Sequence, residues 1–169
     1  MKVIKIAVLF TLFISYKTGF CQTFEVPRNY EYNTGEDYVP YEKDMIKAAD
    51  WLRNTPFNEQ QWKRQEVNKF VVKWIDGSPT VSVEIFPCLM DFEKKNEGML
   101  ILYMASCAKY VLANNYSKDV KAKQKEALQA LIEVYKRGTG INKDSKMEKL
   151  LKADANGQLE EWIKKNMPS

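Results

Sequence analysis

The apolar run from Met99 to Ala113 constrains the fold of this chain more than any other segment, since only Ser106 and Lys109 interrupt it. A helix that is apolar on nearly every side has to be covered by other helices or by lipid. At 1.5 Å per residue the run makes about 22 Å of helix, which is shorter than the roughly 30 Å hydrocarbon core of a bilayer. The run therefore predicts a buried central helix rather than a membrane span.

A helix enclosed on all sides buries two stripes of side chains, whereas an ordinary amphipathic helix buries one. We expect the central helix to bury one stripe of Leu102, Tyr103, Ser106 and Tyr110 and a second of Leu100, Met104, Cys107 and Val111. Truncation of either Leu100 or Leu102 to alanine should then destabilise the fold strongly.

Two amphipathic segments precede the central run. Apolar residues recur at helical spacing over 41–52 and again over 67–75, and the short link between them predicts two helices packed as neighbours. We expect Asn58 to cap the second of these helices. Phe57 is then placed to pack on Trp62 as a hydrophobic staple.

Further helical segments lie on both sides of the central run. Residues 80–86 alternate apolar and polar side chains, but no second strand pattern exists to pair with them, so we expect an extended link. Pro87 opens a short helix directly before the central run. After that run, Ser117 is expected to cap a long amphipathic helix, and two short helical segments begin near Asp144 and Leu159.

The segment 22–39 has no helical period and contains many aromatic and acidic residues. We expect Tyr30, Tyr32 and Tyr38 to pack across the helices, because a tyrosine with a buried ring and a wet hydroxyl adds contact area at low entropic cost. The segment is therefore predicted to form an irregular arm that lies against the bundle.

Taken together, these patterns predict an all-α fold. The chain has 169 residues, of which 45% are hydrophobic, and this composition fits one domain. We expect a single compact bundle of about five or six helices over residues 40–167, arranged around a buried central helix at 99–113 and preceded by the arm.

The first twenty-one residues are typical of a cleaved signal peptide: a basic start, an apolar run from Ile6 to Ile14, and small residues at Gly19 and Cys21. Cleavage after Cys21 leaves Gln22 as the first mature residue, and this leader resembles those of exported proteins of Bacteroidota. We therefore expect a periplasmic or secreted protein with no integral membrane span after processing.

A second interpretation treats Cys21 as the lipid-carrying cysteine of a lipoprotein. A lipoprotein signal has a small residue directly before that cysteine, and this chain has Phe20 there, which favours export without a lipid. The chain has 26 basic and 22 acidic side chains, and three of the lysines lie in the leader, so processing lowers the net charge from +4 to +1. A nearly neutral exported chain argues against nucleic-acid binding.

The chemistry of the chain is limited by the complete absence of histidine. Catalysis by Ser-His-Asp or Cys-His groups is excluded, and we expect no catalytic residues, no metal and no cofactor. Cys88 and Cys107 are the two cysteines of the mature chain, and an exported protein with two cysteines permits one disulfide. The alternative, two buried thiols packed as small hydrophobic side chains, remains equally open.

Three functional hypotheses remain. The first is a non-catalytic module of immunity-, inhibitor- or chaperone-like type that binds an unidentified protein; in size and helix content the chain is similar to periplasmic immunity proteins of contact-dependent toxin systems, without a diagnostic motif. The second is a carrier of a small apolar ligand in a cavity beneath the central helix. The third is a carboxylate-only hydrolase, with Glu97 as an acid whose pKa is raised beside the apolar helix.

Overall fold

The computed structural model describes residues 23–168. The predicted leader and its cleavage site at Cys21 lie outside the described residues. The described part contains one 3-10 helix and seven α-helices: η1 Gly35–Tyr41, α1 Glu42–Asn54, α2 Gln61–Gly77, α3 Pro87–Lys95, α4 Met99–Ala113, α5 Val120–Arg137, α6 Ser145–Ala155 and α7 Leu159–Asn166. The all-α prediction is confirmed, although the estimate of five or six helices is too low. Both short segments that the sequence predicted in the tail form helices, α6 and α7, with a turn at Gly157 between them.

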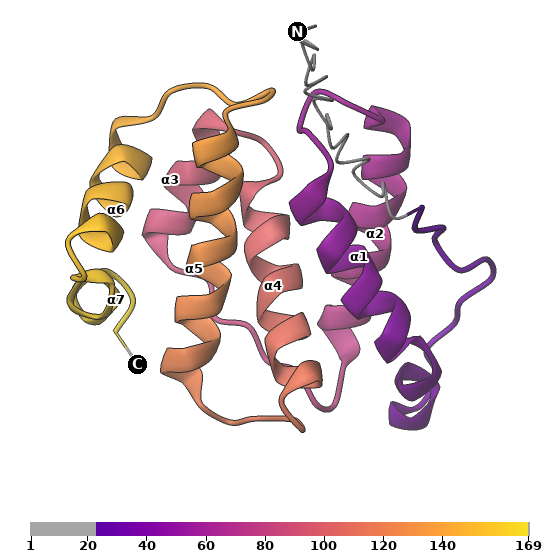
Figure 1. The fold of residues 1–169 in the computed structure, drawn as a ribbon. Helices are drawn as coiled ribbons and strands as arrows, with labels where there is room; N and C mark the ends of the chain where they lie inside the picture. Colours follow the sequence, from indigo (N-terminus) through magenta and orange to yellow (C-terminus); the bar gives the residue numbers. More distant parts are fainter. Residues whose placement is uncertain (1–22, 169) are drawn as a thin grey trace, which may run out of the picture.

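The predicted central helix is α4, which packs against α1, α2, α3 and α5. Figure 1 shows α4 between the α1 and α2 pair on one side and α5 on the other. The C-terminal helices α6 and α7 lie beyond α5, on the side away from α1. Within residues 23–168, no helix combines the length and the apolarity needed to cross a membrane.

The two stripes of α4 are buried unequally. Leu102, Tyr103 and Ser106 of the first stripe are buried, as are Cys107 and Val111 of the second. The remaining members of the two stripes, Leu100, Met104 and Tyr110, are only half-buried. The prediction that both stripes are enclosed is therefore wrong at these positions, because the four neighbouring helices leave part of the surface of α4 in contact with solvent.

The aromatic arm packs against the bundle, as its composition predicted. The rings of Tyr32 and Tyr38 are stacked with their centroids 4.4 Å apart, and the ring of Tyr30 meets Phe70 of α2 edge-on at 5.3 Å. The indole Nε1 of Trp74 donates a hydrogen bond of 3.1 Å to the carbonyl oxygen of Tyr38. The arm is less irregular than expected, because its last residues form η1.

The predicted start of α2 is wrong. The helix begins at Gln61 after a residue in the left-handed conformation, so Asn58 does not cap it. Trp62 points away from the bundle, with 76% of its surface exposed, and makes no hydrophobic staple. Phe57 is buried instead against the guanidinium group of Arg64, whose central carbon lies 4.7 Å from the ring centroid.

The start of α5 also differs from the prediction by two residues. Asp119 is the N-cap, and its carboxylate accepts a hydrogen bond of 3.0 Å from the backbone N–H of Ala122. The hydroxyl of Ser117 accepts a bond of 3.2 Å from the N–H of Asp119 and so supports the cap rather than forming it. The link 80–86 is extended and unpaired, as predicted.

Candidate binding site

The two cysteines that the sequence singled out are unbridged thiols. Cys107 is fully buried on α4, and Cys88 is half-buried at the start of α3. Burial raises the pKa of the Cys107 thiol to about 12. Of the two alternatives, the structure therefore holds two packed thiols, and Cys107 is in an unreactive environment.

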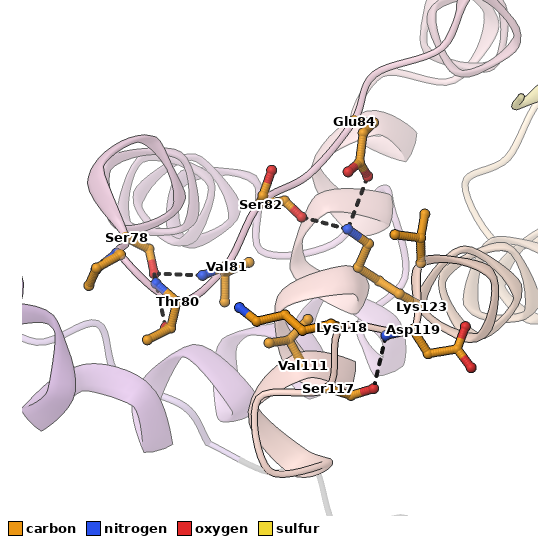
Figure 2. Close-up of a pocket in the computed structure, with 12 residues that line it drawn as sticks. Ser78, Thr80, Val81, Ser82, Glu84, Val111, Ser117, Lys118, Asp119 and Lys123 are labelled. Atoms are coloured by element: carbon orange, nitrogen blue, oxygen red, sulfur yellow. Dashed lines mark hydrogen bonds and ion pairs between the residues drawn. The ribbon is translucent and has the colours of Figure 1, made fainter. Parts of the chain in front are cut away.

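A groove of about 230 Å³ lies between the link before α3, the end of α4 and the start of α5 (Figure 2). Lys123 reaches across it from α5 and is almost fully buried, with 7% of its side chain exposed. Its ammonium group donates a hydrogen bond of 2.7 Å to the carbonyl oxygen of Ser82 and pairs with a carboxylate oxygen of Glu84 at 3.0 Å. The positive charge of Lys123 is thus neutralised within the protein, and its role is to fasten the link to α5.

Two hydroxyl groups of the same groove, those of Ser78 and Ser117, also have internal partners. The Ser78 Oγ accepts a hydrogen bond of 3.3 Å from the N–H of Val81, and the Ser117 Oγ accepts the bond from Asp119 already described (Figure 2). Because its buried cation and these two hydroxyl groups are already paired within the protein, this groove is the weaker candidate.

The hollow beside the middle of α4 differs from the apolar cavity that the carrier hypothesis expected. It measures about 230 Å³ and is lined by Ser106, Lys109 and Tyr110. The ammonium group of Lys109 pairs there with Asp50 of α1 at 2.5 Å. An ion pair beside the central helix makes this space unsuitable for a small apolar ligand.

A third hollow, which we call the Arg64 pocket, has a volume of about 310 Å³. It is formed where the start of α2 meets the α3–α4 turn and the α5–α6 loop. Carboxamide side chains dominate its lining: Gln61, Gln65, Asn68, Asn96 and Asn142. The charged residues that line it are Arg64 and Glu97. Glu97 is exposed, which removes the burial on which its proposed role as a catalytic acid depended.

Arg64 is 5% exposed, and no carboxylate of the described residues pairs with it. Its guanidinium carbon lies 5.5 Å from the ring centroid of Trp51, in addition to the Phe57 contact described above. Nη2 donates hydrogen bonds to the carbonyl oxygens of Thr55 at 2.8 Å and Pro56 at 3.0 Å. Burial lowers the pKa of Arg64 to about 10, which still leaves the group charged at pH 7.

These contacts explain how the fold tolerates a buried cation without a counter-ion. Burying one ion costs on the order of several kcal/mol. Each hydrogen bond from a charged donor returns about 1.5–3 kcal/mol, and a desolvated cation–π contact returns roughly 2 kcal/mol. The stabilising contacts therefore balance the cost of desolvation, and the positive charge of Arg64 remains unneutralised in the folded protein.

Hydrogen bonds between loops fix the walls of the Arg64 pocket. The buried Asn96 side chain donates to the carbonyl oxygen of Asn142 at 3.0 Å and accepts from its N–H at 2.7 Å. The carboxylate of Glu93 accepts hydrogen bonds from the N–H groups of Gly98 and Leu100, at 3.0 and 2.8 Å, and so caps α4. The pocket is consequently held open by structure that does not depend on a ligand.

Sequence reasoning missed Arg64, although a signal for it exists. Counting back along the buried face of α2 from Val71 to Val67 at helical spacing leads to position 64. A charged residue at a core position is unusual and marks either a satisfied internal contact or a site. The same count places Trp62 on the outer face.

The described residues contain no group of three or more acidic or cysteine side chains that could hold a metal ion. Comparison of the chain with models of known protein families, with characterised proteins and with solved structures finds no match.

Proposed function

We propose that this chain is an exported, non-catalytic module that binds another protein through the outer face of α2. The observation that carries the proposal is the exposure of Trp62, which presents 76% of its surface to solvent. Trp51 and Trp74 are both buried. Tryptophan is among the residue types enriched in the side chains that dominate binding energy at protein interfaces.

Trp62 belongs to an exposed stripe that runs the length of α2. The stripe, which we call the α2 stripe, consists of Trp62, Gln65, Lys69, Val72 and Asp76. These positions recur every three or four residues, so they share one side of the helix. Val72 is a second exposed apolar side chain on this line. Exposed apolar residues on one side of a helix are how a helix docks into a groove of a partner.

The partner we propose is a protein of different sequence rather than a second copy of this chain. Two apolar anchors are separated by Gln65 and Lys69, whereas stable homodimers bury a large and continuous apolar surface. Polar residues between anchors are typical of complexes whose subunits also exist apart.

A capture experiment tests the α2 stripe. Residues 22–169 are immobilised and exposed to envelope extract, beside the variants Trp62→Ala and Met90→Ala. Met90 is an exposed apolar side chain on α3 and serves as the matched control. The wild type and the Met90 variant should retain a protein that the Trp62 variant loses. Equal capture by all three would refute the proposal, as would sedimentation showing that Trp62→Ala converts a dimer to a monomer.

Export is tested separately by the intact mass of the protein recovered from cells. The proposal expects a chain that begins at Gln22 and carries no lipid. A diacylglycerol adduct on Cys21, or a chain that retains Met1, would contradict it.

A further inference from the structure

The geometry points to a binding site for a carboxylate group in the Arg64 pocket. This inference goes beyond the proposed protein partner and does not depend on it, because Trp62 does not line the pocket. It rests on an unneutralised positive charge, on unpaired polar atoms and on the charges at the rim.

The charge of Arg64 distinguishes this pocket from the other basic sites of the bundle. The buried Lys123 is neutralised by Glu84, and Arg53 pairs with Glu126 and Glu133. The hydrogen-bond and cation–π partners of Arg64 among the described residues are carbonyl oxygens and aromatic rings, with no carboxylate. An anion that enters the pocket therefore finds a cation with no competing counter-ion, at a place where water screens little.

Unpaired polar atoms give the ligand hydrogen-bonding partners. The hydrogen bonds from Arg64 to Thr55 and Pro56 both use Nη2, and its buried Nε has no partner among the described residues. One turn further along α2, the buried Oδ1 of Asn68 also lacks one. Buried polar groups in folded proteins are nearly always paired, so two such atoms one helical turn apart are available to the polar groups of a ligand. The Nε–H of Arg64 donates a short, charge-assisted bond to a carboxylate oxygen, whereas the Oδ1 of Asn68 is an acceptor and suits an amide N–H in the body of the same ligand.

The two charged residues of the lining favour a monoanion over a dianion. Glu97 stands at the rim and lies in the same pocket as Arg64, so the charged residues of the lining sum to zero. Glu97 repels a doubly charged phosphate more strongly than a singly charged carboxylate, so the lining favours a ligand with one negative charge close to Arg64. The surrounding amides suit the polar body of an acylated amino acid or of a peptide end.

Calorimetric titration of the purified chain 22–169 tests the site with N-acetylglycine, its uncharged analogue N-acetylglycinamide, and inorganic phosphate. We expect saturable one-to-one binding of N-acetylglycine and at least tenfold weaker binding of the amide and of phosphate. Arg64→Gln should weaken binding of N-acetylglycine at least tenfold, and Asn68→Ala should weaken it severalfold. Gln158→Ala, an exposed carboxamide in the turn before α7, is the matched control and should bind like the wild type.

Circular dichroism establishes that each variant is folded, and Asn68→Ala keeps the test decisive if Arg64→Gln does not fold. The carboxylate can come from a free acid or from the end of a protein chain, and N-acetyl-trialanine with a free or amidated end separates these sources. Tighter binding of the free tripeptide acid than of N-acetylglycine assigns the site to a chain terminus, and equal binding assigns it to small acids.

Three results would overturn the inference: equal binding of N-acetylglycine and its amide, tighter binding of phosphate, or an unchanged affinity in Asn68→Ala. Trp62→Ala should leave the affinity for N-acetylglycine unchanged. The capture experiment therefore tests the protein-binding proposal and the calorimetric titration tests the carboxylate site, so either proposal can fail without the other.

Discussion

Gly140 offers a sharp test of how tightly the α5–α6 loop closes the Arg64 pocket. Its φ is +71°, in the left-handed region, and a Cβ placed on it would lie 2.5 Å from the backbone nitrogen of Asn58. Gly138 and Gly157 have nearly the same φ, +73° and +71°, but a Cβ on either would meet no atom within 4 Å. Alanine at the three positions therefore imposes the same backbone strain and differs only in the steric clash.

The magnitudes follow from these contacts. Left-handed backbone costs a non-glycine residue roughly 1–2 kcal/mol, which applies to all three alanine variants. The clash at Gly140 involves backbone, which cannot rotate away, and overpacking of this kind costs about 1–3 kcal/mol more. With a slope of about 2 kcal/mol per molar urea, the additional cost lowers the unfolding midpoint by about 0.5–1.5 M.

Equilibrium urea unfolding followed by tryptophan fluorescence measures this difference directly. Gly140→Ala should have a lower midpoint than Gly138→Ala and Gly157→Ala, which should resemble each other. The wild type provides the reference for the shared backbone strain. If all three variants shift by the same amount, the loop that carries Gly140 does not press against Asn58, and the reasoning about the pocket wall is wrong.

Three further predictions concern the leucines of α4, the buried thiol of Cys107 and the carboxylate of Asp37. Leu102→Ala should lower the unfolding free energy by about 2–5 kcal/mol, whereas Leu100→Ala should lower it less because the side chain of Leu100 is half-buried. The urea midpoints of the two variants test this difference. Cys107, with its pKa raised by burial, should resist iodoacetamide at pH 8 until urea unfolds the chain, as peptide mass mapping would show. Backbone hydrogen bonds from the turn at Thr34 lower the pKa of Asp37, so the stability it contributes is present above its unfolded pKa of about 3.9 and is lost as the pH falls through the lower folded value. Asp37→Asn should therefore lose less thermal stability than the wild type between pH 5 and pH 3, and equal losses by calorimetry would contradict this.

The sequence predicted correctly those parts of the fold where only one arrangement buries the apolar residues of a segment. An apolar run such as Met99 to Ala113, too short for a bilayer, has to be buried among helices, and α4 is at the centre of the bundle. The same reasoning predicted that the tyrosines of the arm would pack. Leu100 was misplaced because the sequence does not show which neighbours are long enough to cover each turn of α4.

Local choices between competing contacts were harder to predict. The hydrophobic-staple rule placed Phe57 against Trp62, whereas its place before α2 also put it near Arg64. In the structure the ring of Phe57 packs against the guanidinium group of Arg64, and Trp62 is exposed. Ser117 and Asp119 are both good N-caps, and backbone angles that the sequence does not reveal decide between them. The Arg64 pocket combines residues from three segments distant in sequence, so its shape could not be inferred before the fold.

The position of α4 in the middle of the chain also bears on how the protein is made. α1, α2 and α3 precede it and are available to pack on it, but α5, its other neighbour, is complete only at Arg137. Ribosomes add about 5–20 residues per second, so the side of α4 that faces α5 waits on the order of 1–5 s for its cover after Ala113 is added. During that interval the nascent chain displays the most apolar helix of the described residues with one face bare. Slow synthesis of residues 114–137 would lengthen this interval and favour association between unfinished chains.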